Sequence, residues 1–334
     1  MKAAVYRGAG QPLALETLPE PEPGPNDVII EMHRCGICGT DLHMTEGGPW
    51  QFPPGTVPGH EYAGKVIECG SNVTQLKQGD LITALPSTGC GRCEACYRGN
   101  LALCHKAPGV MGGYAELMRI PAEIAVKLPN TLTAADGALI EPLAVGLYGV
   151  RLSRIQPGDR VLVLGAGSVG LCVMYWARRM GAARIVALSR SERRARAATA
   201  MGADAFIRYG QNEVETAAAA LGGRPDIVFE CVGSPGFLMK AVEHVRDFGQ
   251  VISMGFCTAP DQLVPAVTGF KGVSLRFPVG YALKDFEYVA AVMDKGHVDP
   301  KMLITSVISL SELPDRFEAL RGPGNETKVQ IRPQ

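Results

Sequence analysis

Two patterns of apolar and polar positions follow one another along the chain. Up to about residue 130 the sequence is rich in Gly and Pro and shows short β-like runs, for example 28–31 and 64–68, without long helical periodicity. Short apolar runs bounded by turn-forming residues are typical of strands. The first part of the chain is therefore expected to form an irregular all-β domain.

The second pattern begins at Pro157, where short apolar runs alternate with stretches of helical periodicity. Helices are expected up to Met180 and over Glu192–Met201. The expected strands cover residues 160–164, 184–188, 205–208, 226–229, 250–253 and 272–277. Alternation of strands and helices predicts an α/β fold with a doubly wound parallel sheet, and six strands fit the dinucleotide-binding order.

The tail after Pro278 has a helical pattern over Lys284–Lys295 and short strand-like runs, and it is expected to return to the first domain. The resulting boundaries are 1–144 for the β domain, 145–278 for the sheet domain and 279–334 for the returning segment. A length of 334 residues also favours two domains over one.

Charge and targeting signals narrow the function classes. The 33 basic and 33 acidic residues balance, and no long basic run occurs, so nucleic acid and anionic membrane are not expected as partners. Residues 161–177 are nearly apolar, but their glycines favour a strand-turn-helix over a membrane span. The first residues lack the apolar core of a signal peptide, which predicts a cytoplasmic protein.

Four of the ten cysteines, Cys90, Cys93, Cys96 and Cys104, lie within fifteen positions. Clustered thiols in a chain without a secretion signal point to metal binding, and four thiolates match a closed tetrahedral zinc site. A closed site has no position for substrate, so this zinc is expected to be structural. An iron–sulfur cluster and two disulfides are the alternatives.

A glycine pattern follows the strand expected at 160–164. Its residues are Gly165, Ala166, Gly167, Ser168, Val169 and Gly170. G-x-G-x-x-G between a strand and a helix is the fingerprint of dinucleotide binding, in which the helix N-terminus receives the pyrophosphate. A glycine-rich packing turn is the alternative interpretation.

The residues after the second strand of this domain predict the cofactor. NAD sites usually carry Asp or Glu there, whereas this chain has Ser189 and Arg190 after an expected strand end at Leu188. Serine and arginine can both bind a 2′-phosphate, so NADP is expected in preference to NAD. Tyr209 is expected near the adenosine, and Arg193 and Arg194 could assist. An ordinary loop is the alternative.

A second set of metal-ligand types is spread over the first domain. Cys38, Thr40, Asp41 and His43 form one short stretch; His60 and Glu61 follow Gly59; and Glu141 precedes Pro142. Cys38, His60 and a carboxylate would supply the three ligands of a catalytic zinc with an open position. These residues alone leave ordinary packing as an equal possibility.

The chain resembles the zinc-containing medium-chain alcohol dehydrogenase superfamily over essentially its whole length. The elements C-G-x-C-G-T-D-x-H, G-H-E-x-x-G, the four cysteines, E-P-L and G-x-G-x-x-G occur in family order. The resemblance implies a GroES-like catalytic domain and a Rossmann domain. It also implies that Cys38, His60 and Glu141 bind the catalytic zinc, that Glu61 acts as a ligand or through water, and that Asp41 orients His60.

Two branches of the family are mixed in this sequence. Glu141 resembles the sorbitol, threonine and butanediol dehydrogenases, whereas Ser189, Arg190 and Tyr209 resemble the NADP-dependent secondary alcohol dehydrogenases. The implied reaction is reversible hydride transfer between the nicotinamide and a secondary alcohol or ketone, or a diol or polyol.

The resemblance also implies a route for the proton, which passes through Thr40 and the cofactor ribose to His43. Trp50 is expected either to wall the substrate pocket or to pack in a loop. A zinc-free enone or quinone reductase and a non-catalytic NADP-binding protein are the competing functions. A homo-oligomer, dimer or tetramer, is expected.

Overall fold

The computed structural model describes residues 1–107, 109–297 and 299–333, and the chain folds into two compact units. Unit 1 comprises residues 1–144 and 280–334, and unit 2 comprises residues 145–279. The helix α4 (Ile140–Leu152) runs from one unit into the other. This helix was not predicted, because Pro142, Gly146 and Gly149 interrupt its helical pattern.

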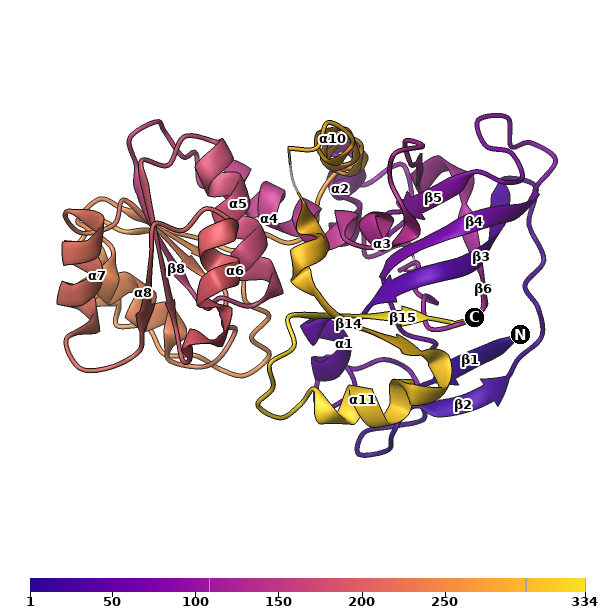
Figure 1. Ribbon diagram of the computed structural model, residues 1–334, viewed down its shortest axis with the longest axis horizontal. Coiled ribbons are helices and arrows are strands. Elements are labelled where there is room, and N and C mark those ends of the chain that lie inside the picture. The colour runs from indigo at the N-terminus through magenta and orange to yellow at the C-terminus, as the bar shows by residue number, and fades with distance from the viewer. Residues whose placement is uncertain (108, 298, 334) are drawn as a thin grey trace. The chain divides into compact units, whose positions relative to one another are not determined.

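Unit 1 is built mainly of strands. A mixed seven-stranded sheet has the order β14–β15–β3–β4–β5–β7, with β6 also paired to β3, and β1 and β2 form a separate hairpin. The strands are β1 (Lys2–Val5), β2 (Ala14–Thr17), β3 (Asp27–Gly36), β4 (Glu61–Cys69), β5 (Leu81–Ala84), β6 (Leu117–Pro121), β7 (Ala125–Lys127), β14 (Ile304–Ser309) and β15 (Lys328–Arg332). Figure 1 shows β14 and β15, from the end of the chain, beside β3 from its beginning.

Short helices connect these strands. They are α1 (Gly39–His43), α2 (Glu94–Tyr97), α3 (Ala134–Gly137), α10 (Leu283–Asp294) and α11 (Leu313–Ala319), with 3₁₀ turns at η1 (Leu101–Leu103), η2 (Ala122–Ile124), η4 (Pro300–Leu303) and η5 (Leu310–Glu312). Residues 280–334 belong to unit 1, and α10 lies one residue earlier than the expected 284–295.

Unit 2 has a six-stranded parallel sheet in the order β10–β9–β8–β11–β12–β13. Numbered from the start of the unit, this is 3-2-1-4-5-6, which confirms the predicted doubly wound sheet. The strands are β8 (Arg160–Leu164), β9 (Arg184–Ser189), β10 (Ala205–Arg208), β11 (Ile227–Glu230), β12 (Gln250–Ser253) and β13 (Ser274–Arg276).

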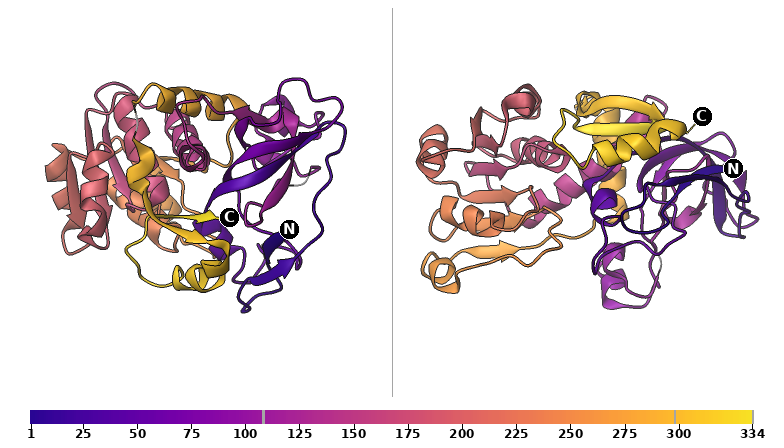
Figure 2. Two further views of the ribbon diagram at one scale, coloured as in Figure 1. Left: turned by 45° about the vertical axis from the view of Figure 1, so that its right-hand side comes forward. Right: turned by 90° about the horizontal axis from the view of Figure 1, so that it is seen from below.

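Helices cover both faces of this sheet. Figures 1 and 2 show α5 (Ser168–Arg179) and α6 (Ala195–Ala200) on one face, and α7 (Glu213–Leu221) and α8 (Phe237–His244) on the other. The turn η3 (Glu192–Arg194) precedes α6, and α9 (Pro265–Phe270) precedes β13. Leu162, Leu164 and Val186 pack against α7 and α8. Strands buried on both faces explain the nearly continuous apolar runs in the sequence.

Candidate functional site

Asp41 organises the first candidate site, in unit 1. It lies in α1, the short helix that starts directly after Cys38, and it is fully buried. Its Oδ2 accepts hydrogen bonds from the backbone N–H of Cys38 (3.1 Å) and from the hydroxyl of Tyr114 (2.6 Å). Its Oδ1 lies 3.1 Å from Nδ1 of His60. Asp41 therefore fixes both the start of α1 and the imidazole of His60.

The position of His60 depends on the glycine before it. Gly59 has a φ of +93°, and a Cβ there would lie 2.5 Å from the Tyr114 ring. Because Nδ1 of His60 faces Asp41, the other ring nitrogen, Nε2, is left to bind a metal. The sulfur of Cys38, one ring nitrogen of His60 and one carboxylate oxygen of Glu61 all lie within 4.8 Å of one another.

The charges of Asp41 and His60 support each other. Burial by itself would raise the pKa of Asp41, but the His60 charge and the hydrogen bonds from His60, Tyr114 and Cys38 lower it overall. Burial likewise acts to lower the pKa of His60, but Asp41 and Cys38 raise it well above its usual value. A metal ion at this imidazole must therefore displace a proton.

Glu61 is paired on one oxygen only. Its Oε1 accepts a 2.6 Å hydrogen bond from Nζ of Lys328 on β15, and both side chains are almost fully buried. Lys328 also donates to the carbonyl of Ile37 (3.2 Å). Within the described residues, Oε2 of Glu61 is buried without a hydrogen-bond partner. A buried carboxylate oxygen of this kind fits a cation, so the residues present are suited to a metal.

Glu141 lies outside the compact donor group of Cys38, His60 and Glu61. It is the second residue of α4 and is buried, and its Oε1 accepts a 2.5 Å hydrogen bond from the hydroxyl of Tyr281. Burial raises the pKa of Glu141 to about 7, and the charge of Glu61 adds to this rise while His60 and Tyr281 act against it. The structure thus gives Glu141, which was expected as the third zinc ligand, a partner of its own.

Three contacts of this site were not found from the sequence: those of Tyr114, Tyr281 and Lys328. None belongs to a motif, and each lies more than seventy positions from its partner. Lys328 occupies a polar position in the alternating run Lys328–Arg332, a pattern that also fits a solvent-facing strand. The sequence held no signal that separates a buried lysine paired with a carboxylate from a lysine that faces solvent.

The other predicted residues of this region lie on or after α1. Thr40 is half-buried, and His43 follows one turn later on the same helix, with Nδ1 3.4 Å from Oε2 of Glu46. Trp50 is 60% exposed.

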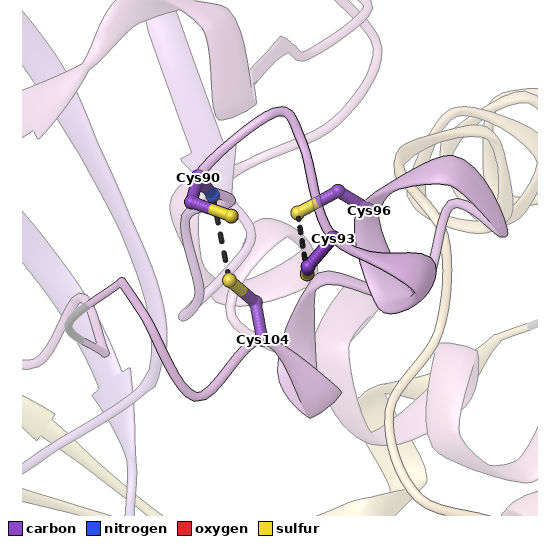
Figure 3. Close-up of side chains that lie close together, drawn as sticks. All are labelled: Cys90, Cys93, Cys96 and Cys104. Carbon is purple, nitrogen blue, oxygen red and sulfur yellow. Dashed lines mark hydrogen bonds between the residues drawn. The ribbon is translucent and has the colours of Figure 1, made fainter.

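The four clustered cysteines form a second donor group in unit 1, shown in Figure 3. One sulfur from each of Cys90, Cys93, Cys96 and Cys104 lies within 4.8 Å of the others. The sulfurs of Cys93 and Cys96 are 3.5 Å apart, too far for a disulfide, and all four cysteines are free thiols. Backbone N–H groups of Cys90 and Lys106 lower the pKa of Cys104 to about 6, which favours the thiolate that a metal needs.

The glycine pattern of unit 2 joins β8 to α5. Gly165 has a φ of +95°, and a Cβ on Gly170 would lie 2.0 Å from the carbonyl oxygen of Gly165. Nothing lies within 4 Å of the position of a Cβ on Gly167, so a ligand can approach its backbone. Ser168 and Val169 open α5, and within the described residues Oγ of Ser168 is buried without a partner.

The predicted end of the second strand is corrected by one residue. Strand β9 ends at Ser189, which pairs with Arg208 of β10, and not at Leu188. The expected strand end was early because Ser189 is polar, although the backbone pairing continues through it. Arg190 is the first residue after the strand and is exposed.

Two further arginines and a tyrosine gather near Arg190. Burial lowers the pKa of Arg194, and the charges of Arg190 and Arg193 lower it further. Among the described residues, the hydroxyl of Tyr209 is buried without a partner, and Nζ of Lys240 lies 4.7 Å from the centre of its ring. Buried unpaired hydroxyls at Ser168 and Tyr209 fit a polar ligand at this end of the sheet.

Comparison with known proteins identifies both units. Residues 24–130 match the alcohol dehydrogenase GroES-like domain, and residues 168–295 match the zinc-binding dehydrogenase family. The chain is 31% identical to sorbitol dehydrogenase of Bacillus subtilis, over 100% of this chain and 97% of that protein. It is also 31% identical to (R,R)-butanediol dehydrogenase of the same organism, over all of both chains.

A solved structure agrees with these relatives. A Sinorhizobium meliloti protein described as a zinc-binding dehydrogenase and bound to NADP superposes with a TM-score of 0.90, at 32% identity over 99% of each chain. Within the described residues of this chain, no helix combines the length and apolarity needed to cross a bilayer. The predicted fold class of a GroES-like and a Rossmann domain is confirmed. The chain belongs to the zinc-containing medium-chain alcohol dehydrogenase superfamily and is an enzyme of that class.

Proposed function

We propose that this enzyme transfers hydride between NADP and a secondary alcohol or ketone, or a diol or polyol, at a zinc ion held in unit 1. The observation that carries the metal site is the group of Cys38, His60 and Glu61, in which a buried oxygen of Glu61 has no partner among the described residues. The sorbitol and butanediol dehydrogenases among the relatives support a substrate with more than one hydroxyl group.

Cys38, His60 and Glu141 would hold the catalytic zinc, with Glu61 as a further ligand or a partner through water. When bound, zinc supplies Lewis-acid chemistry that favours loss of the hydroxyl proton from an alcohol. Asp41 fixes the tautomer of His60, Tyr281 orients Glu141, and Lys328 balances the charge of Glu61. His60, Glu141 and Glu61 are thus each held in place by a side chain of this protein.

Thr40 and His43 would move the proton. They lie three positions apart on α1, so their side chains project from neighbouring points of one helix face. Thr40 and His43 are both half-buried as residues, and the side chain of His43, which borders Glu46, is 39% exposed. The solvent access of His43 suits a route in which Thr40 Oγ1 accepts the proton and His43 passes it to solvent.

The cofactor would occupy the carboxyl end of the sheet in unit 2. Bound nicotinamide supplies or accepts the hydride. Gly165, Gly167 and Gly170 allow close approach of the pyrophosphate, and the first turn of α5 offers free N–H groups. Ser189 lacks the charge that would repel a 2′-phosphate, and Arg190 with Arg194 provides positive charge for it.

The preference for NADP is tested by steady-state kinetics with both cofactors. We expect a higher kcat/KM with NADP than with NAD, mostly through KM. Arg190→Ala should reduce that preference by about one to two decades, the contribution of one charge-assisted hydrogen bond, and Ser189→Asp should favour NAD. Arg184→Ala, at the opposite end of β9, is the matched control. A clear preference of the wild type for NAD would overturn the assignment.

The four-cysteine group would hold a second, structural zinc. Two separate donor groups, one with four thiols and one with mixed donors, lead us to expect two zinc ions per chain. Elemental analysis of folded, metal-replete protein measures this directly. A value of one would remove one of the two sites, and a value of none would remove both. Assembly as a homo-oligomer and a cytoplasmic location stay predictions.

A further inference from the structure

Two arginines lie at the end of the pairing between β3 and β15. In this antiparallel pair Gln330 is opposite Gly36 and Ile331 is opposite Cys35, and Arg332 and Arg34 are the next residues of the two strands. Both side chains line the same cavity, and their like charges repel each other. Neither arginine has a carboxylate partner among the described residues.

The guanidinium group of Arg34 is also incompletely bonded. Its Nη1 donates to the carbonyl of His33 (2.8 Å), but its Nε is buried and has no hydrogen-bond partner in the part of the chain that the structure describes. Burial lowers the pKa of Arg34, and the charge of Arg332 lowers it further. A buried, unpaired donor next to a second cation is costly unless an anion is bound.

A cavity of about 470 Å³ adjoins both side chains. Besides the two arginines it is lined by Met32, His33, Thr133 and the first turn of α3. One wall is fixed because Nε2 of Gln330 donates to the carbonyl of Ala135 (2.9 Å). None of the lining residues is acidic, so nothing in the wall would repel a negative charge.

The carboxylates that adjoin the lining residues in sequence are engaged elsewhere. Asp136 accepts hydrogen bonds from the backbone N–H and hydroxyl of Thr133 and lies 3.9 Å from Lys301. Glu31 lies 3.2 Å from His33. Neither acid forms an ion pair with Arg34 or Arg332. The two guanidinium groups thus face the cavity without an ion pair to any carboxylate of residues 1–107, 109–297 and 299–333.

We propose that this cavity binds a phosphate group, either free or carried by a small organic molecule. A phosphate dianion balances two guanidinium charges, and its oxygens accept the paired N–H donors that arginine presents. The apolar side chains of Met32, Ala134 and Ala135 line the rest of the cavity, where the organic part of a ligand can pack. This site shares no residue with the proposed zinc or cofactor sites.

The experiment uses zinc-replete enzyme saturated with NADP, so that its dinucleotide site is filled. Inorganic phosphate is titrated at constant ionic strength against chloride, with binding measured by calorimetry and stability by thermal unfolding. Phosphate should bind and raise the melting temperature in proportion to the logarithm of its concentration. Glycerol 3-phosphate is titrated alongside: tighter binding identifies an organic phosphate, and equal binding identifies free phosphate.

Two variants make the test specific. Arg332→Gln removes the repulsion, so it should melt at a higher temperature than wild type without phosphate, yet bind phosphate at least about tenfold more weakly. Arg34→Lys keeps the charge but loses the Nε donor, and it should also bind more weakly. The control is Arg179→Gln, an exposed arginine at the end of α5. The proposal fails if wild type binds no phosphate, or if both site variants bind it as the control does.

Discussion

At the scale of single residues, Asp41 shows how one buried carboxylate holds several groups from different parts of the chain in place. It bonds to the backbone of Cys38, the hydroxyl of Tyr114 and the ring of His60, which come from three separate stretches of sequence. Removing the charge of Asp41 while keeping the shape of its side chain isolates its effect on these groups. Asp41→Asn should weaken zinc binding at the mixed site about 10–100-fold, the usual effect of losing a partner behind a metal ligand.

Competition with a chelator of known affinity measures this loss, and the four-cysteine zinc serves as the internal reference. The expected pattern is one weakened zinc and one unchanged zinc. Equal weakening of both ions would indicate general unfolding, and unchanged affinity at both would contradict the role given to Asp41.

Thr40 offers a residue-scale test of the proton route. Thr40→Ala should reduce turnover by about 10²–10⁴-fold, the usual contribution of a general acid–base group, while both zinc ions stay bound. Thr40→Ser keeps the hydroxyl and should retain most activity. His43→Ala should lose less, because its exposed ring can be replaced by buffer or water. Wild-type rates for Thr40→Ala over the full pH range would exclude Thr40 from the route.

At the scale of elements, the loop of four cysteines is the smallest part with a separable role. Cys93→Ser opens a closed donor set whose metal binding is coupled to local folding. We expect a lower unfolding temperature and the loss of one zinc, with unchanged turnover per active site counted by titration. Cys257→Ser, at an exposed cysteine outside the group, is the control. Unchanged stability with lost turnover would reverse the two zinc roles.

Asp226 joins three strands of the parallel sheet at their amino ends. Its Oδ2 accepts from the backbone N–H (2.8 Å) and Nε (3.1 Å) of Arg160 on β8, its Oδ1 accepts from Nε of Arg246 (2.5 Å), and its carbonyl accepts from the backbone N–H of Gln250 on β12 (3.0 Å). Burial acts to raise the pKa of Asp226, but these arginines and hydrogen bonds lower it overall below 3.8.

Asp226→Asn should therefore destabilise unit 2 by about 1–3 kcal/mol at neutral pH. Because the folded-state pKa is lowered, the contribution is complete above pH 3.8 and is lost as pH falls through the lowered pKa. The difference between wild type and variant should be flat from about pH 5 to 8 and shrink below pH 3.8. Urea unfolding followed by the fluorescence of buried Trp176 measures it, with the exposed Asp247→Asn as control.

Predictability from sequence differs between elements for physical reasons. The sheet of unit 2 could be predicted because each strand is a local apolar run and six strands that alternate with helices fit the dinucleotide-binding order. The predicted end of β9 was one residue too early, because Ser189 is polar but its backbone still pairs with β10. In the site, motif residues such as Cys38 and His60 could be named, whereas Tyr281 and Lys328 could not, because their contacts depend on how distant segments pack.

At the scale of the whole molecule, unit 1 is assembled from two separated stretches of chain, 1–144 and 280–334. The second stretch contributes β14 and β15 to the sheet, Tyr281 to Glu141 and Lys328 to Glu61. Unit 2 is continuous in sequence. The stability of unit 1 therefore depends on contacts of high sequence separation, whereas unit 2 forms from neighbouring segments.

This order has a consequence for synthesis on the ribosome. Residues 145–279 separate the two stretches of unit 1, and these roughly 135 residues take about 7–27 s to translate. During that time the second half of β3 lacks its neighbour β15, and Glu61 lacks Lys328. All of the four-cysteine group, by contrast, emerges within fifteen residues. The nascent chain can thus capture its structural metal early, whereas the mixed donor site is completed only after the last strand leaves the exit tunnel.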